Sequence, residues 1–251
     1  MSEKQAKRYT PKFKFQVMLE VLRGIKSIGQ IARSYGVHPI SIIRAVKRPK
    51  ESAIRVLLRE TGRRVNLVAI LKEIEDFDVL STDFTEIRYA QGQAKPHLMP
   101  IIDHKSKLVL GHAFGESADI ELALEAWKRT RFQLKRMGKK VKEVIIHHDQ
   151  DGDFIGHEWL HQIAVKDKVR VSYSEDRAKG NVQIESFIGR LKEENRLLFW
   201  EQENLEALKG VVNVRIRYYN RVRRHSALGN RSPLKYLKEK GRIASRDASE
   251  K

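Results

Sequence analysis

The chain has 251 residues, a length that fits a small domain joined to a medium-sized one. It contains no cysteine, which excludes disulfides and thiolate-bound zinc and makes a reducing cytoplasm the expected setting. The basic first 15 residues have no apolar run behind them, and no apolar stretch approaches the length of a membrane span, so we expect neither a signal peptide nor a transmembrane helix.

The net charge of +18 is concentrated toward the two ends of the chain. Residues 1–64 hold 16 Lys and Arg against 4 Asp and Glu, and residues 209–242 hold 11 against 1. The intervening residues 65–208 hold 21 against 25 and are slightly acidic. This distribution suits a metal-dependent enzyme whose flanks bind a polyanion, although a merely soluble basic protein has a similar composition.

Residues 1–48 predict three short helices that form a helix-turn-helix DNA-binding domain. Ser27-Ile28-Gly29-Gln30 has the spacing of a capping box, and Gly36-Val37 supplies the turn before a third helix that starts at His38-Pro39. The alternative is a three-helix bundle that binds protein or nothing, and the charge of the segment favours DNA. The expected core residues are Ile31, Ala32, Val37, Ile42 and Ile43, and the expected DNA contacts are His38, Ser41, Arg44 and Lys47.

Residues 49–75 are expected to form a helical connector, because apolar side chains recur among mixed charges at helical spacing. This connector is either a pair of helices or part of a second helix-turn-helix.

Residues 76–242 change to a mixed α/β pattern. Strands are predicted at 78–87, 97–103 and 107–114, and the turn residues between them indicate an antiparallel meander. The following elements are a helix at 119–135, a short apolar strand that ends at Asp149, a helix at 156–165, a strand at 169–173 and helices at 180–194 and 204–221.

Three acidic residues stand out in this segment. Asp83 is expected inside the first strand, and Asp149 is expected just past the fourth, where reacting groups of open α/β sheets lie. Glu185 is expected on a helix that crosses the sheet edge. Mg²⁺ prefers oxygen ligands and keeps several waters, so a few carboxylates are enough to hold it.

Each acid taken alone is more often a solvated surface charge than a ligand. Asp151 and Asp153 could substitute for Asp149, and Glu86 could substitute for Asp83. His147 and His148 are interpreted as packing or polar support, because a site for a hard metal does not need them.

The spacing of the three acids, with 65 residues between Asp83 and Asp149 and 35 between Asp149 and Glu185, resembles the catalytic triad of the retroviral integrase superfamily. The local sequence is most similar to bacterial transposases of the insertion-sequence-three family. The resemblance implies a ribonuclease-H-like fold with a mixed five-stranded sheet, in which all three acids are catalytic and bind two Mg²⁺ or Mn²⁺ ions. It also implies that Lys192 contacts the DNA of the element end and that Asn181 supports Glu185.

The C-terminal sequence extends this resemblance. Arg217-Tyr218-Tyr219-Asn220, Arg223-Arg224-His225-Ser226-Ala227-Leu228 and Ser232-Pro233 are similar to the ending of the same family, which makes Arg223, Arg224 and His225 candidate DNA contacts. Two departures are Gln150-Asp151-Gly152-Asp153, where the family has Gln-Gly-Ser-Gln, and His148, where the family has Ser. Residues 243–251 are expected to be a disordered tail.

The family implies a transposase that cleaves and joins double-stranded DNA at the element's terminal repeats and at the target. It would act as a homo-oligomer in the bacterial cytoplasm, associated with the nucleoid. Two alternatives stay open at the level of sequence. One is a DNA-binding regulator that uses a catalytically weakened fold as a scaffold, and the other is a nuclease without strand transfer.

Overall fold

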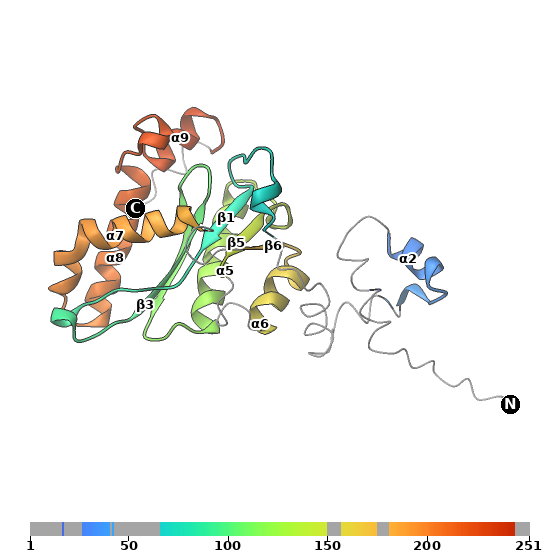
Figure 1. The fold of residues 1–251 in the computed structure, drawn as a ribbon, viewed down its shortest axis with the longest axis horizontal. Helices are drawn as coiled ribbons and strands as arrows, with labels where there is room; N and C mark the ends of the chain where they lie inside the picture. The colour runs from blue at the N-terminus through green and yellow to red at the C-terminus, as the bar shows by residue number, and fades with distance from the viewer. Residues whose placement is uncertain are drawn as a thin grey trace. The chain divides into compact units, whose positions relative to one another are not determined.

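The computed structural model describes residues 17, 27–40, 42, 66–149, 157–174 and 181–243. The chain divides into two compact units, residues 1–63 and 64–251 (Figure 1). None of the helices in the described ranges is long and apolar enough to cross a membrane.

The described part of the first unit contains helix α2 (Ile28–Ser34). Its predicted capping box is present, since Gln30 donates its amide to the Ser27 side chain and the Gln30 side chain accepts from the Ser27 amide. A small core forms from Val17, Ile31, Ala32 and Ile42, with Tyr35 and Val37 packed against it. Ile43 and most of the expected first and third helices lie outside the described residues, so the helix-turn-helix stays a prediction.

The second unit is built on a six-stranded mixed sheet. The strands are β1 (Val79–Thr82), β2 (Thr85–Glu86), β3 (His97–Asp103), β4 (Val109–Gly115), β5 (Ile145–His148) and β6 (Arg170–Tyr173). β1 pairs antiparallel with β3 and parallel with β5, which in turn pairs parallel with β6. β4 joins the outer side of β3, and β2 pairs with the start of β3, in line with β1.

The expected five strands become six because the first one breaks at Asp83-Phe84. Thr82 pairs with Ile101, so the antiparallel register places Asp83 opposite Pro100. Proline has no N–H to donate to the ladder. The Thr82 hydroxyl instead donates to the Pro100 carbonyl at 2.8 Å, and the ladder resumes at Thr85.

Helices cover both faces of the sheet (Figure 1). On one face, α7 (Val182–Trp200) and α8 (Leu205–Arg221) share a core with the strands that includes Ile102, Phe187 and Tyr219. On the other face, α5 (Ile120–Arg136) lies so close to β4 that a Cβ on Gly111 would sit 2.3 Å from the Thr130 hydroxyl oxygen. A glycine is therefore required at this contact.

The remaining helical elements of the second unit are short. They are η1 (Val68–Ile70), η2 (Ala90–Gly92), η3 (Val141–Glu143), α6 (His157–Leu160), η5 (His161–Lys166), η6 (Ser226–Leu228) and α9 (Pro233–Glu239). The prediction of a helical connector was wrong for residues 71–75, which are irregular. Residues 49–65 lie outside the described ranges. Of residues 243–251, expected to be a disordered tail, Ile243 is buried, and residues 244–251 lie outside the described ranges.

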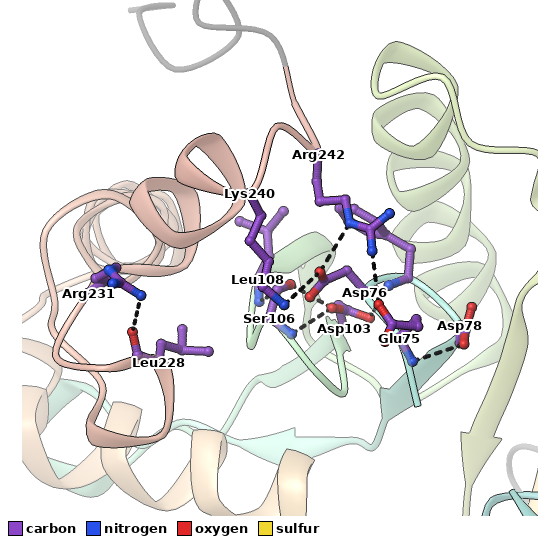
Figure 2. Close-up of polar contacts among 11 residues, drawn as sticks. Glu75, Asp76, Asp78, Asp103, Ser106, Leu108, Leu228, Arg231, Lys240 and Arg242 are labelled. Atoms are coloured by element: carbon purple, nitrogen blue, oxygen red, sulfur yellow. Dashed lines mark hydrogen bonds and ion pairs between the residues drawn. The ribbon is translucent and has the colours of Figure 1, made fainter. Parts of the chain in front are cut away.

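The C-terminal end of α9 is held against the start of β1 by charged groups (Figure 2). Arg242 binds Glu75 at 2.9 Å and lies 3.5 Å from the buried carboxylate of Asp76, and the Lys240 ammonium lies 3.7 Å from the same carboxylate. Nearby, Asp103 accepts hydrogen bonds from the Phe77 amide and from both the amide and hydroxyl of Ser106. Burial raises the pKa of Asp103 to about 6, against the opposing effect of these hydrogen bonds.

Candidate active site

Asp83 and Asp149 lie at the carboxyl ends of two neighbouring parallel strands. In the pairing of β1 with β5, Ser81 lies opposite His147, and the aspartate follows two residues later in both segments. The register therefore places Asp83 and Asp149 side by side at the edge of the sheet that the carboxyl ends of these two strands form. Both side chains are half-buried. This is the juxtaposition expected from the sequence if the two strands paired directly.

The sequence predicted Asp83 inside the first strand, and this prediction was wrong. Asp83 follows β1 directly and occupies the break opposite Pro100. One of its carboxylate oxygens accepts the Phe84 amide at 2.8 Å. The break frees Asp83 from the pleat of the sheet, and this local hydrogen bond fixes the orientation of its carboxylate.

Asn181 attaches the first turn of α7 to the residue before Asp83. Its side-chain Nδ2 donates to the carbonyl oxygen of Thr82 at 3.0 Å, and the residue is 2% exposed. One turn later, the Glu185 amide donates to the Asn181 carbonyl at 3.2 Å. Glu185 itself is exposed on that first turn. Asn181 thus connects the helix of Glu185 to the strand of Asp83.

The oxygen donors suit a hard divalent cation, because carboxylates are the ligands that Mg²⁺ and Mn²⁺ take in proteins. Among the residues that the structure describes, however, no three His, Cys, Asp or Glu side chains are gathered into a group able to hold a metal ion. Asp151 and Asp153, the alternatives to Asp149, lie outside the described residues. Glu86, the alternative to Asp83, is exposed on β2.

The two histidines before Asp149 are buried, as expected for packing and support. A His147 ring nitrogen lies 2.9 Å from the Ser172 hydroxyl, and His147 is 2% exposed. The His148 ring makes edge contacts with Tyr173 and Trp159. These contacts hold the end of β5 against β6 and α6.

Lys192 lies two turns after Glu185 on the same face of α7. Burial lowers the pKa of its ammonium, while the carboxylates of Glu86 and Asp83 act in the opposite direction. The side chain therefore lies within electrostatic reach of Asp83, which is consistent with a role beside the carboxylates.

The three C-terminal candidates for DNA contact differ in their surroundings. The Arg223 Nε lies 2.9 Å from both carboxylate oxygens of Glu194, and this partner raises the pKa of the guanidinium. His225 is 4% exposed, its ring packs edge-on against Tyr219, and burial lowers its pKa to about 4. Arg224 is exposed. The geometry favours packing for His225 and leaves Arg224 the best placed of the three to meet DNA.

Asn220 has a role that the sequence did not suggest. Its side-chain amide donates to the Val109 carbonyl at 2.9 Å and accepts from the Val109 amide at 3.0 Å, so it pairs with the β4 backbone as another strand would. This contact fastens α8 and the C-terminal sequence to the sheet.

In the first unit, His38 is exposed. The other three expected DNA contacts, Ser41, Arg44 and Lys47, lie outside the described residues.

The sequence reasoning missed a groove beside α7. It has a volume of about 700 Å³, and its wall includes Ile87, Arg88, Lys192, Arg196 and Trp200. The predicted helix ended at Glu194, whereas α7 continues to Trp200. Continuing the spacing of Glu185 and Lys192 along the helix would have brought Arg196 and Trp200 onto the same face.

Comparisons with known proteins agree with this architecture. Residues 168–233 match the family model described as "Integrase core domain". A probable transposase for insertion sequence element IS1353 of Shigella flexneri is 30% identical over 161 residues, which cover 62% of this chain and 29% of that protein. The match therefore spans less than a third of the curated relative's length.

Two solved structures also resemble the chain. The simian T-cell lymphotropic virus intasome in complex with PP2A regulatory subunit B56 gamma aligns with a TM-score of 0.55 and 12% identity, covering 90% of this chain and 74% of that one. The HTLV-2 integrase catalytic core domain in complex with magnesium, in its trimeric form, aligns with a TM-score of 0.49 and 14% identity, covering 66% and 99%. Residues 168–233 are therefore similar to integrase core domains, and the chain shares its fold with the simian virus intasome structure.

Proposed function

We propose that this protein is a transposase of the DDE type, whose catalytic residues are two aspartates and a glutamate. It would cleave the ends of a DNA element and join the resulting 3′-hydroxyl to target DNA. The observation that carries the proposal is the parallel pairing of β1 with β5, whose register brings Asp83 beside Asp149. The hydrogen bond from Asn181 to Thr82 brings the helix of Glu185 to the same edge. The relation to the IS1353 transposase supports the choice of transposition.

We assign Asp83, Asp149 and Glu185 as ligands of two Mg²⁺ or Mn²⁺ ions. When bound, such ions would activate the attacking oxygen and stabilise the leaving oxygen of a phosphodiester. Asp83 and Asp149 offer oxygens from a sheet edge whose direction the strands fix. Glu185 is exposed and can reorient its side chain toward that edge without breaking the core.

The DNA substrate would be bound by cations around this edge. Lys192 lies within electrostatic reach of Asp83 and would contact a phosphate near the reacting bond. Arg224 would contact the flanking backbone, and the predicted helix-turn-helix would recognise the terminal repeat. Because one chain carries one set of three acids, processing both ends of an element calls for a homo-oligomer, a dimer or larger.

The assignment is tested by replacing Asp83, Asp149 and Glu185 with Ala one at a time. Each substitution should abolish Mg²⁺-dependent cleavage and joining of an end-containing duplex, while gel-shift affinity for that duplex is retained. Glu203→Ala serves as a control, because Glu203 is an exposed acid that does not line the groove beside α7. Joining at the parent rate by all three variants would remove the assignment.

One observation favours a competing role as a DNA-binding scaffold, namely the absence of a pre-gathered group of three metal ligands among the described residues. A scaffold would bind end DNA but would bind no divalent cation at Asp83 or Asp149. A nuclease without strand transfer would cleave an intact end and fail to join one that is already cut. A joining assay on a pre-cut end therefore separates the transposase from the nuclease.

A further inference from the structure

One face of α7 leads away from Glu185 along a groove. Gly189, Lys192, Arg196 and Trp200 follow Glu185 at intervals of three or four residues, and all four line the groove. At the rise of an α-helix, Trp200 lies about 22 Å beyond Glu185 along the axis. Figure 1 shows α7 as one uninterrupted helix over this length.

The groove runs along the face of α7 that also carries Glu185. Lys192 lies in the groove wall, where burial lowers the pKa of its ammonium, Glu86 and Asp83 raise it, and Arg88 lowers it. Arg88, Lys192 and Arg196 contribute three cations to the groove wall, against the two acids Glu86 and Glu193. Lys192 and Arg196 are separated by about 6 Å along the helix, which approximates the spacing of neighbouring phosphates in an extended strand.

Trp200 forms a fixed aromatic surface at the far end of the groove. It is 40% exposed, whereas the other two tryptophans of the chain, Trp127 and Trp159, are fully buried. The backbone of Gly92 lies against its indole, since a Cβ on Gly92 would sit 2.7 Å from an indole carbon. The Ala90 amide donates to the Gln202 carbonyl at 3.0 Å and ties this loop to the end of α7.

The loop under Trp200 adopts a costly backbone. Ala90, Gln91 and Gly92 have φ of 48°, 53° and 86°, and a left-handed conformation is unfavourable for the first two. Such a conformation persists where the surrounding contacts fix it, and here they place Gly92 against the indole. The indole is therefore held in one orientation with part of its surface facing the groove.

We propose that this groove binds an unpaired DNA strand, with one nucleobase stacked on Trp200 and the neighbouring phosphates on Lys192, Arg196 and Arg88. The proposal rests on the proposed function, because it takes the strand to be the frayed end of the DNA whose phosphodiester reacts at the acids. Aromatic stacking combined with cations along the backbone is how proteins bind single strands without reading their sequence. The three cations favour this occupant over an apolar protein helix.

Intrinsic fluorescence gives a specific test, because Trp200 alone among the three tryptophans faces solvent. The full chain is titrated, without divalent metal, with a short single-stranded oligodeoxynucleotide and with the same sugar-phosphate chain carrying abasic sites. The oligonucleotide should quench the Trp200 emission, and the abasic chain should not. Trp200→Phe should remove the quenching, and Trp200→Ala should weaken binding of the oligonucleotide by about tenfold.

A matched pair of glycine variants tests the path of the strand. Gly189 and Gly210 are both exposed within helices, and a Cβ on either would meet nothing within 4 Å. Gly189→Leu should fill the groove and weaken oligonucleotide binding by about tenfold. Gly210→Leu on α8 makes the same chemical change outside the groove and should leave binding unchanged.

The proposal is supported if the base-bearing strand quenches the emission and Trp200→Phe abolishes this quenching. Gly189→Leu, but not Gly210→Leu, should also reduce it. Binding without quenching, or an equal effect of both glycine variants, overturns the proposal. A change in Trp200 emission that follows protein concentration but not oligonucleotide assigns the groove to a second copy of the chain and also overturns it. Because no metal is present, failure of the catalytic assignment would leave these results unaffected.

Discussion

The side chain of Asn181 donates a hydrogen bond to the carbonyl oxygen of Thr82 at 3.0 Å, and both residues are buried. Thr82 directly precedes Asp83, and Asn181 directly precedes the helix that carries Glu185. This contact therefore joins the start of α7 to the strand end where Asp83 lies. Asn181 acts as a positioning residue in the proposed site, because it would act through Glu185.

Replacing Asn181 should separate positioning from stability. Asn181→Ala leaves the buried Thr82 carbonyl without its donor, which should lower the free energy of unfolding by roughly 1–3 kcal/mol. Asn195→Ala is a matched control, because Asn195 is also buried on α7 and donates to the Leu191 carbonyl at 2.7 Å within the helix. We expect similar losses in urea denaturation but a fall in joining rate only for Asn181→Ala. Equal joining rates would assign Asn181 a purely structural role.

The contact between α5 and β4 makes Gly111 intolerant of any side chain. A Cβ there would lie 2.3 Å from the Thr130 hydroxyl oxygen and 2.7 Å from the Ala126 carbonyl oxygen. Gly111→Ala should therefore destabilise the protein by about 2 kcal/mol or more, since backbone atoms cannot move aside easily. Gly210→Ala, in open space on α8, should instead stabilise it by roughly 0.5–1 kcal/mol. Thermal unfolding of both variants checks the prediction, and unchanged stability of Gly111→Ala would contradict the packing.

Burial of His225 predicts a pH dependence of stability. Its pKa falls to about 4 in the folded chain from an ordinary value of 6.5, so the unfolded chain binds the proton more tightly. The neutral ring therefore contributes stability that is fully present above pH 6.5 and is lost as the pH falls toward 4. His225→Phe keeps an aromatic ring against Tyr219 and removes the titration. Between pH 7.5 and 4.5 the parent should lose roughly 2 kcal/mol more unfolding free energy than this variant.

Arg223 and Arg224 should affect different properties. Arg223→Ala breaks the contact with Glu194, and because that pair is partly solvated it should cost about 1 kcal/mol at most. Arg224→Ala should leave stability unchanged and reduce the slope of log affinity against log salt by about 0.9 if Arg224 contacts one phosphate of the duplex. Salt-dependent binding isotherms for both variants measure this difference. An unchanged slope for Arg224→Ala would exclude the phosphate contact.

The elements with strong local signals were predictable from sequence. The bounds of β3 at His97–Asp103 agree fully with the prediction, and α5 begins one residue after its predicted start, with Asp119 accepting the Leu122 amide as its N-cap. Alternation and capping depend only on neighbouring residues, so one sequence is enough to read them.

The breaks and the groove depend on contacts between distant residues. No residue next to Asp83 in the sequence marks the end of β1. The strand ends there because Pro100, which has no N–H to donate, lies opposite Asp83 in the pairing. Residues near Leu67 carry a helical pattern, yet the Leu67 amide donates to the Ser172 hydroxyl at 2.9 Å, and only the short 3₁₀ helix η1 follows it. Trp200 becomes a groove wall because Gly92, more than 100 residues earlier in the chain, packs against its indole.

The central claim is tested most directly by the number of Mn²⁺ ions that the full chain binds. Electron paramagnetic resonance measures the free ion, and the bound number follows by difference. If Asp83, Asp149 and Glu185 hold the metals, the parent should bind two Mn²⁺ per chain, and Asp83→Asn and Glu185→Gln should each bind fewer. Binding of Mn²⁺ by both variants with the stoichiometry and affinity of the parent would contradict the proposed active site.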